Sequence, residues 1–553
     1  MKALFGLFVA TATATAATTT VIGSQDDVMF KAMTSELERS IKRLRINGHE
    51  APYYLSYTVH DTNSVRLAAA FGAVTENTTT KHRDLNVDLR IGDYKLDSSS
   101  TLASNQSPFG RLSRMFGHSG SLPYDDDYDS LRHKLWLATD ASYKQAVESL
   151  ESNKRYLKDN NVEERPDAMS REQPVVLIKP AAHLELDNKK WAESLRKLSG
   201  MFRDYPKILR SHTSFAAQAD TRWFINNEGF TNRIGETCFL FTASGAAQAA
   251  DGMVVSDNEL IPAWKEIDLP NQAGLESLTK RLAERLIDLT NAPALADDYR
   301  GPVLFEGQAS AEFFDQVLAT KLCANRQNPM QQMLGGGDLS ERIGQRILPS
   351  FMNVIDDPTA KEYKGAKLFG TCEVDDDGVR SQKITLVEKG LLKTLAMSRT
   401  PTKELKQSNG HSRYGSAALT NLFITTDAPV PFSGMKEKLI QLGKEDGLKY
   451  VYIVRKITDS PLEMDISSMQ SLLKSIMRGG SGVFVLPPVL VYQVSTADGK
   501  EQLVRGAQFV NLTMRSLRDI EAAGDDARAY PIVSGQDVLS AVAPSVLVKE
   551  IEL

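Results

Sequence analysis

The side chains that bind catalytic metals are sparse in this sequence. It contains three cysteines and eight histidines. The histidines are His49, His60, His82, His118, His133, His183, His212 and His411. A zinc hydrolase needs two or three His, Cys or carboxylate ligands around one ion, and two ligands on one helix lie about one turn apart. The closest histidines, His49 and His60, are eleven residues apart. No helix therefore presents two histidines together, although a site assembled from distant segments stays open.

Nucleophile and phosphate motifs are also missing. No Gly-x-Ser-x-Gly elbow occurs, and the Gly-rich segments 334–338 and 478–482 lack the lysine and spacing of a phosphate-binding loop. The acidic run Asp375-Asp376-Asp377-Gly378 lacks the alternating ligands and distal glutamate of an EF-hand, so it predicts a hairpin turn. Cys323 has no histidine near it in sequence. The residues alone indicate no catalytic constellation.

Composition is that of a soluble globular protein. The chain has 553 residues, 42% hydrophobic and 24% charged, which predicts two or three domains. Its net charge of −5 gives no support to nucleic acid or an anionic membrane as a partner, because both need a concentrated basic face. No apolar run reaches the ~20 residues that a membrane-spanning helix needs.

The N-terminal segment predicts export. Lys2 precedes the apolar run 3–10, and small residues follow it, as in a secretory signal peptide. We therefore expect a signal peptide at 1–23 and a secreted or periplasmic protein; a Thr/Ala-rich disordered tail is the alternative. The three cysteines are widely spaced and odd in number, so no disulfide framework is indicated and buried free thiols are favoured.

The rest of the chain predicts an α+β protein with two domains. The first, 24–298, is a mixed α/β sheet domain with a flexible insertion around 98–125, and the second, 299–553, is β-rich, antiparallel and barrel-like. Hairpin turns are indicated at Asp377-Gly378, Lys389-Gly390 and Asp498-Gly499. Apolar periodicity and turn residues predict helices at 28–45, 128–157, 188–203, 274–290 and 309–323, and strands at 52–98, 215–220, 221–225 and 238–243.

Residues 356–413 resemble the core signature of the TldD/PmbA family, often called modulators of DNA gyrase. The similar segments are Asp356-Asp357-Pro358, 370–379 (GTCEVDDDGV), 386–393 (LVEKGLLK), Ser398-Arg399 and 408–413 (SNGHSR). Near the C-terminus, 503–507 (LVRGA) and 523–526 (AGDD) resemble the closing segment of the same domain. The order and spacing of these pieces carry the resemblance.

The resemblance implies a metallopeptidase-like protein that lacks its metal. Active members have an H-E-x-x-x-H helix and a later cysteine as zinc ligands. The best register places Phe314, Asp315 and Ala319 where His, Glu and His would stand, and residues 414–503 contain no cysteine. We therefore expect no catalytic residue of that type, no zinc or other cofactor in this chain, and zinc only in a partner subunit. Carboxylates alone would at best hold a hard ion such as calcium.

Three functions follow as hypotheses. The first is a non-catalytic partner subunit of a peptidase acting on unfolded peptides, paired with a zinc-bearing TldD-like homologue or with itself as a dimer. Peptide would add as a strand to an exposed sheet edge, and the resemblance offers Arg399, Asn409 and Arg413 as peptide-groove candidates. The second is an active peptidase with an unrecognised site. The third is a non-enzymatic peptide-binding or structural homodimer.

Overall fold

The structure, a computed structural model, describes residues 27–99, 120–161, 165–295, 298–326, 338–457, 485–510, 512–534 and 537–553. The predicted signal peptide at 1–23, most of the predicted insertion at 98–125 and most of the Gly-rich segments lie outside the described residues.

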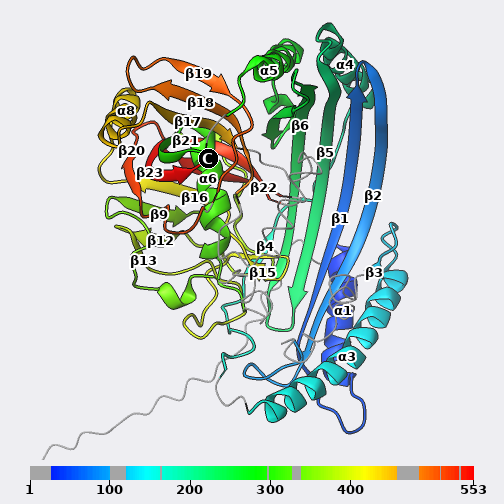
Figure 1. The fold of residues 1–553 in the computed structure, drawn as a ribbon. Helices are drawn as coiled ribbons and strands as arrows, with labels where there is room; N and C mark the ends of the chain where they lie inside the picture. Colours follow the sequence, from blue (N-terminus) through cyan, green and yellow to red (C-terminus); the bar gives the residue numbers. More distant parts are fainter. Residues whose placement is uncertain are drawn as a thin grey trace, which may run out of the picture.

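A seven-stranded sheet dominates the N-terminal part, and its longest strands lie side by side in Figure 1. The path runs β3-β2-β1-β5-β6-β4, and β7 also pairs with β6. All pairs are antiparallel except β4 with β6. The strands are β1 (Pro52–Ala70), β2 (Ala73–Ile91), β3 (Gly120–Ser121), β4 (Val176–Ile178), β5 (Ile208–Asn226), β6 (Thr231–Gln248) and β7 (Val254–Ala263).

The two faces of this sheet differ because side chains alternate along each strand. In β1 the odd-numbered Tyr57, Val59, Val65 and Leu67 are buried, and four helices cover their face. Helices α1 and α3 pack near one end of the strands, and α4 and α5 near the other, over two separate hydrophobic cores. The helices are α1 (Val28–Arg43), α3 (Tyr128–Asp159), α4 (Asn188–Gly200) and α5 (Gln272–Asn291).

Each of these helices begins at a side-chain cap. Asp27, Asp127, Asp187 and Asn271 accept backbone N–H groups of the first turn, which satisfies donors that a helix start leaves open. The four helices agree with the sequence predictions in position, within a few residues at each end.

The C-terminal part contains two six-stranded sheets, which Figure 1 shows beside the long sheet. The first runs β13-β12-β9-β16-β22-β21 and the second β19-β18-β17-β8-β23-β20. Their strands are β13 (Leu391–Leu392), β12 (Ile384–Glu388), β9 (Met352–Asp356), β16 (Asn421–Thr426), β22 (Asp537–Ala543), β21 (Arg528–Ser534), β19 (Glu501–Val504), β18 (Pro488–Ser495), β17 (Tyr450–Ile457), β8 (Arg300–Phe305), β23 (Val546–Glu552) and β20 (Ile520–Ala523).

Smaller elements complete this part. Two hairpins, β10 (Glu362–Tyr363) with β11 (Ala366–Lys367) and β14 (Ser412–Arg413) with β15 (Ser416–Ala417), stand apart from the sheets. Helix α8 (Met435–Glu445) packs on β8 and β17, and helix α6 (Gln308–Leu318) packs on β17 and β22. The mixed α/β, sheet-rich architecture agrees with the sequence prediction, but the described strands form open sheets and close no barrel.

The turn predictions can be checked directly. Lys389 and Gly390 have φ of 47° and 76° and join β12 to β13, as the Lys-Gly pair predicts. Asp498-Gly499 joins β18 to β19. The two strands expected at 215–220 and 221–225 are one continuous strand, β5. Among the described residues, no helix combines the length and apolar character that a membrane crossing requires.

Candidate functional site

Helix α6 occupies the place where the family resemblance puts a metal-binding helix. Its first residue follows Gly307, whose φ is +53° and whose added Cβ would come within 2.9 Å of the Tyr530 hydroxyl. Phe314 is fully buried, and Ala319 begins the short 3-10 turn Ala319–Leu322 that follows the helix. Asp315 is half-buried, and burial raises its pKa to about 6. Since no basic side chain within the described ranges pairs with it, it is a carboxyl that titrates near neutrality.

The donors around α6 do not fit a zinc ion. Cys323 is buried, its thiol donates to the Ala319 carbonyl at 3.6 Å, and burial raises its pKa to about 12, so the free thiol stays protonated at neutral pH. His411 is the sole histidine after residue 212. Both of its ring nitrogens already have partners, the Asn409 carbonyl and the Asp356 carboxylate, each at 2.9 Å. In the described part of the chain, no three His, Cys, Asp or Glu side chains converge as a metal site would need.

Asp356 and His411 instead form a buried, hydrogen-bonded pair that joins two signature loops. We use "signature loops" for residues 356–358, 370–379 and 398–413. The Asp356 carboxylate accepts the Thr420 hydroxyl at 2.5 Å and the Thr420 N–H at 3.0 Å, beside His411. Asp356 and His411 are at most 1% exposed. Every donor and acceptor is therefore used within the protein, which suits a positioning role and leaves none for a ligand.

The acidic turn 375–378 fastens a signature loop to the long sheet. The Asp375 carboxylate accepts the N–H groups of Asp377, Val379 and Ser412 at 2.8–3.0 Å. Burial, together with the nearby Asp377 carboxyl, raises the pKa of Asp375 well above its usual value. Gly378 has φ of +80°, and an added Cβ would lie 2.8 Å from the Phe224 ring. The predicted turn is therefore present, closed by the antiparallel bridge between Val374 and Arg380, and its carboxylates are used within the protein.

Arg399, a predicted groove residue, is a buried clamp between two segments of the chain. It is 2% exposed, and its guanidinium donates to both oxygens of Glu228 at 2.5 and 2.9 Å and to the Ser170 carbonyl at 2.7 Å. The rings of Tyr54 and Phe230 lie 5.5 and 5.4 Å from it. This bidentate, charge-assisted pair ties the loop after β13 to the turn between β5 and β6.

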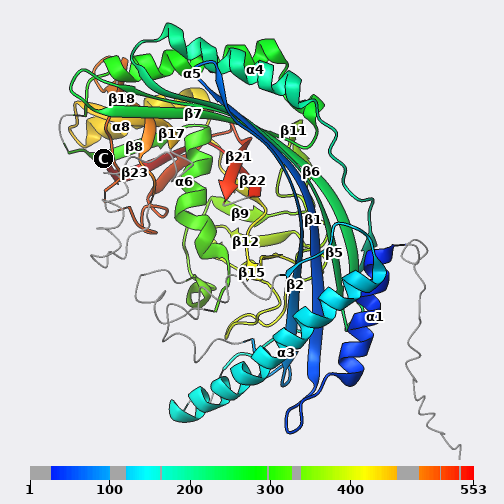
Figure 2. The ribbon, with the colours of Figure 1, turned by 90° about the vertical axis from the view of Figure 1, so that its right-hand side faces the viewer.

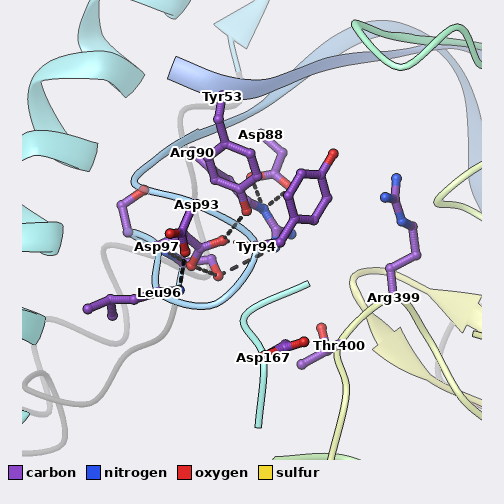
Figure 3. A network of polar contacts seen from close by, with 12 residues as sticks. Tyr53, Asp88, Arg90, Asp93, Tyr94, Leu96, Asp97, Asp167, Arg399 and Thr400 are labelled. Atoms are coloured by element: carbon purple, nitrogen blue, oxygen red, sulfur yellow. Dashed lines mark hydrogen bonds and ion pairs between the residues drawn. The ribbon is translucent and has the colours of Figure 1, made fainter. Parts of the chain in front are cut away.

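A network beside this clamp holds the loop that follows β2, as Figure 3 shows. The Tyr53 hydroxyl donates to Asp97 at 2.7 Å, and Arg90 pairs with Asp88 at 2.8 Å and with Asp97 at 3.5 Å. Burial and the Asp97 carboxylate raise the pKa of Tyr53. The same loop carries Tyr94, whose hydroxyl donates to Glu228 at 2.5 Å. Glu228 therefore accepts hydrogen bonds from Tyr94, on the loop after β2, and from Arg399, on the loop after β13.

The face of the long sheet opposite the four helices is polar. It carries the even-numbered residues of β1, β2 and β5, and Figure 2 shows these strands curving around the C-terminal part. His60 Nδ1 lies 3.0 Å from Asp220 Oδ2, and the Thr62 hydroxyl donates to Asp220 Oδ1 at 2.5 Å. Burial alone would raise the pKa of Asp220, but these hydrogen bonds and the nearby Arg222 leave it below its usual value. An ionised carboxylate thus orients an imidazole that is 40% exposed.

Charged residues link this polar face to the signature loops. Arg222 on β5 pairs with Asp376, and Lys179 pairs with Glu373 at 2.8 Å. Glu236 on β6 is the register partner of Asp220, and the charges of Arg413 and Arg222 act on its carboxylate. Strand register brings these residues together, and no local sequence motif could have revealed them.

The remaining predicted groove residues have different settings. Asn409 is half-buried: its side-chain oxygen accepts the Met397 N–H at 2.7 Å, and its side-chain nitrogen donates to the Leu395 carbonyl at 2.8 Å. Arg413 lies half-buried on β14, close enough to Glu236 and Cys372 to shift their pKa values. Of the three candidates, Arg413 alone borders the polar face, and peptide contact by any of them stays a prediction.

Comparison with known proteins identifies the C-terminal part. Residues 298–448 match the family model of the PmbA/TldA metallopeptidase C-terminal domain. A metalloprotease of Archaeoglobus fulgidus is 35% identical over 79 residues, which cover 14% of this chain and 17% of that protein. A metalloprotease of Methanothermobacter thermautotrophicus is 22% identical over 207 residues, 37% of this chain and 43% of that protein. These matches span less than half the length of either relative.

The whole fold also has solved counterparts. A structure from Thermotoga maritima, described as a modulator of a DNA gyrase, aligns with a TM-score of 0.60 at 17% identity and covers 95% of this chain and 99% of its own. TldE from Thermococcus kodakarensis aligns with a TM-score of 0.56 at 11% identity and covers 94% and 99%. At such identities the likeness extends to the fold alone.

Proposed function

We propose that this chain, whose residues 298–448 form a PmbA/TldD-family domain, is a metal-free member that binds unfolded peptides and serves as the non-catalytic partner subunit of a peptidase. The observation that supports the proposal is the set of residue types on and just after helix α6. In the register of the resemblance, Phe314, Asp315 and Ala319 stand where ligands would be, and two of the three are apolar and buried. Bound zinc would supply a hydroxide nucleophile near neutral pH, and this donor set offers it no imidazole or thiolate.

Peptide binding is supported by the polar face of the long sheet. His60, Thr62 and Glu236 present hydrogen-bonding groups there, and the fixed pairs Arg222–Asp376 and Lys179–Glu373 keep the signature loops beside it. A preformed polar surface binds an extended main chain with little reorganisation, because an unfolded peptide brings its own unpaired N–H and C=O groups. The partner subunit in this proposal is a zinc-bearing homologue or a second copy, and the site of action is outside the cytoplasm.

Metal analysis and peptide assays test this proposal together. Purified protein should contain far less than one zinc per chain, should bind a fluorescent unstructured peptide, and should cleave it only after a zinc-bearing homologue is added. Asp220→Asn is the informative variant, because it removes the carboxylate that orients His60 on the polar face. Glu550→Gln, which alters an exposed ion pair, is the matched control. Stoichiometric zinc that resists dialysis, or no peptide binding at any concentration, would overturn the proposal.

A second candidate, an active peptidase with its own site, is favoured by one observation. Asp315 is a carboxyl with a pKa of about 6, and a general base works best when its pKa lies near the operating pH. Chelator-resistant cleavage by the isolated chain that disappears in Asp315→Asn would select this candidate. Cleavage that appears only with an added homologue would reject it.

A further inference from the structure

An exposed aromatic side chain lies at the tip of the hairpin that joins β14 to β15. Tyr414 and Gly415 form the two-residue turn between Arg413 and Ser416, with φ of 49° and 78°. Asparagine, aspartate or glycine is usual at the first position of such a turn, because a larger side chain is strained at positive φ. Tyr414 is nevertheless 73% exposed. Strained residues of this kind gather at ligand-binding sites.

Phe71 shows what an aromatic side chain in this conformation does when it serves the fold. It has φ of 45° at the turn between β1 and β2, and it is partly buried against the hydrophobic core beneath α4 and α5. Packing therefore explains the aromatic residue at that turn. It does not explain Tyr414, which leaves most of its surface exposed to solvent.

One carboxylate fixes the hairpin tip beside the polar face of the long sheet. Asp376 accepts the Tyr414 N–H at 2.8 Å through one oxygen and pairs with Arg222 on β5 through the other. Arg222 is the register partner of His60 on β1. Figures 1 and 2 likewise show β15 on the side of the long sheet that faces the C-terminal part. Tyr414 thus lies next to the surface that is proposed to bind peptide.

Carboxylates lie on the polar face around this point. Asp84 on β2 is the register partner of His60, and Glu236 on β6 is the register partner of Asp220. Asp84 and Glu236 are both exposed, and no ion pair joins either of them to another described residue. Asp220 has a pKa below its usual value and is ionised at neutral pH.

The cations nearby do not balance these carboxylates. Arg222 and Lys179 each pair already with a carboxylate of a signature loop. Arg413, the residue before Tyr414, acts on Glu236, but it brings one positive charge to a group of three carboxylates. Negative charge and the face of an aromatic ring both attract cations. This part of the polar face is therefore suited to a positively charged side chain.

We propose that Tyr414, Asp84, Asp220 and Glu236 form a subsite for lysine or arginine side chains of an unfolded peptide. The inference rests on the peptide binding proposed above and adds the chemical class of the peptide. Alternate residues of an extended chain face the same side, about 7 Å apart. A peptide with a basic residue at every second position therefore directs its cations toward the sheet.

Fluorescence anisotropy with two matched peptides tests this selectivity. Both peptides are labelled and unstructured; one has lysine at every second position, and the other has glutamine at the same positions. The wild-type chain should bind the lysine peptide about 10-fold more tightly at low salt, from one cation–π contact and several exposed charge pairs. Added salt should reduce the difference, because it screens charges that are exposed to solvent.

Substitutions locate the subsite. Tyr414→Ala should weaken binding of the lysine peptide about 3–5-fold and leave the glutamine peptide almost unaffected, whereas Tyr414→Phe keeps the ring and should behave as wild type. Glu236→Gln should weaken the lysine peptide alone, about 2–5-fold. Tyr450→Ala is the matched control, because Tyr450 is another exposed tyrosine, 47% exposed on β17, and should change neither affinity. Unchanged circular dichroism would show that the variants fold.

The outcomes separate this inference from the proposal on which it rests. A wild-type chain that binds neither peptide would overturn both. Equal affinity for the two peptides would overturn the subsite and leave peptide binding standing. The subsite would also be overturned by a Tyr414→Ala variant that binds the lysine peptide as tightly as wild type, or that loses both peptides to the same extent.

Discussion

Replacing Glu228 by glutamine should cost this protein much of its stability. The substitution keeps the shape of the side chain but removes the carboxylate that receives both arms of the Arg399 guanidinium. Arg399 is 2% exposed, so water cannot replace the lost partner. It would keep the Ser170 carbonyl, the faces of two aromatic rings and the electrostatic influence of the Asp377 carboxyl, but no carboxylate bonded to the guanidinium.

The size of the effect follows from that burial. Breaking a buried ion pair from one side typically costs about 3–5 kcal/mol, because it leaves an uncompensated charge in a medium of low dielectric constant. Replacing both members by apolar residues leaves no such charge. The double variant Glu228→Leu with Arg399→Met should therefore recover a substantial part of the loss, a non-additivity expected of residues in direct contact.

Urea unfolding followed by circular dichroism measures these differences. The exposed pair Arg300–Glu550, with side chains 66% and 53% exposed, supplies the control, since Glu550→Gln should change stability by less than about 1 kcal/mol. A loss from Glu228→Gln no larger than that of the control would contradict the cost of an unpaired buried Arg399. So would a double variant that loses the full sum of the two single losses, because the penalty would then not arise from an unpaired charge.

Three further changes have definite expected results. Asp315→Asn should remove a pH dependence of stability. The pKa of Asp315 in the folded protein is about 6 and exceeds the ordinary 3.8, so the folded state binds the proton more tightly than the unfolded state. Wild-type stability should therefore fall by up to about 3 kcal/mol between pH 4 and 7, which urea midpoints at several pH values would show. Gly378→Ala should cost about 2–4 kcal/mol of stability, from the positive φ and the close ring of Phe224. Gly415→Ala, which has a similar φ and open space around it, should cost about 1 kcal/mol. Equal losses of stability in thermal unfolding would contradict the contact between residue 378 and Phe224. Lys456→Met should cost about 1–3 kcal/mol, because the buried ammonium bonds Asp257 at 2.8 Å while Arg285 still pairs with that carboxylate at 2.6 Å. A loss below about 1 kcal/mol in urea would show that water reaches this site.

The parts that the sequence predicted well are those set by local chemistry. Apolar periodicity located α1, α3, α4 and α5, and their Asp or Asn caps mark the starts. The Lys389-Gly390 turn was identifiable because consecutive residues with positive φ suit a two-residue hairpin. Helix α6 begins one residue before the predicted start, but its last turn tightens into a 3-10 turn at Ala319. Such fraying is not encoded in a hydrophobic pattern.

What the sequence could not predict depends on contacts between distant residues. Arg399 and Glu228 are 171 positions apart, and nothing local distinguishes a groove arginine from a buried clamp. Asp220 and Glu236 meet because β5 and β6 pair in one register, and a slip of one residue would send them to opposite faces. The barrel-like expectation is not confirmed by the described strands, which form open sheets, since closure is decided by which strands finally pair and not by strand content.

The long central strands have a consequence for how the molecule opens. Strands β1 and β5 each run beneath α1 at one end and α4 at the other, so two hydrophobic cores share the same backbone ladder. Opening one core would break hydrogen bonds of the shared ladder and so weaken the packing of the other core on the same strands. Amide hydrogen exchange along β1 and β5 should therefore slow toward a single, shared opening rate in the middle of the strands, so that both cores behave as one cooperative unit.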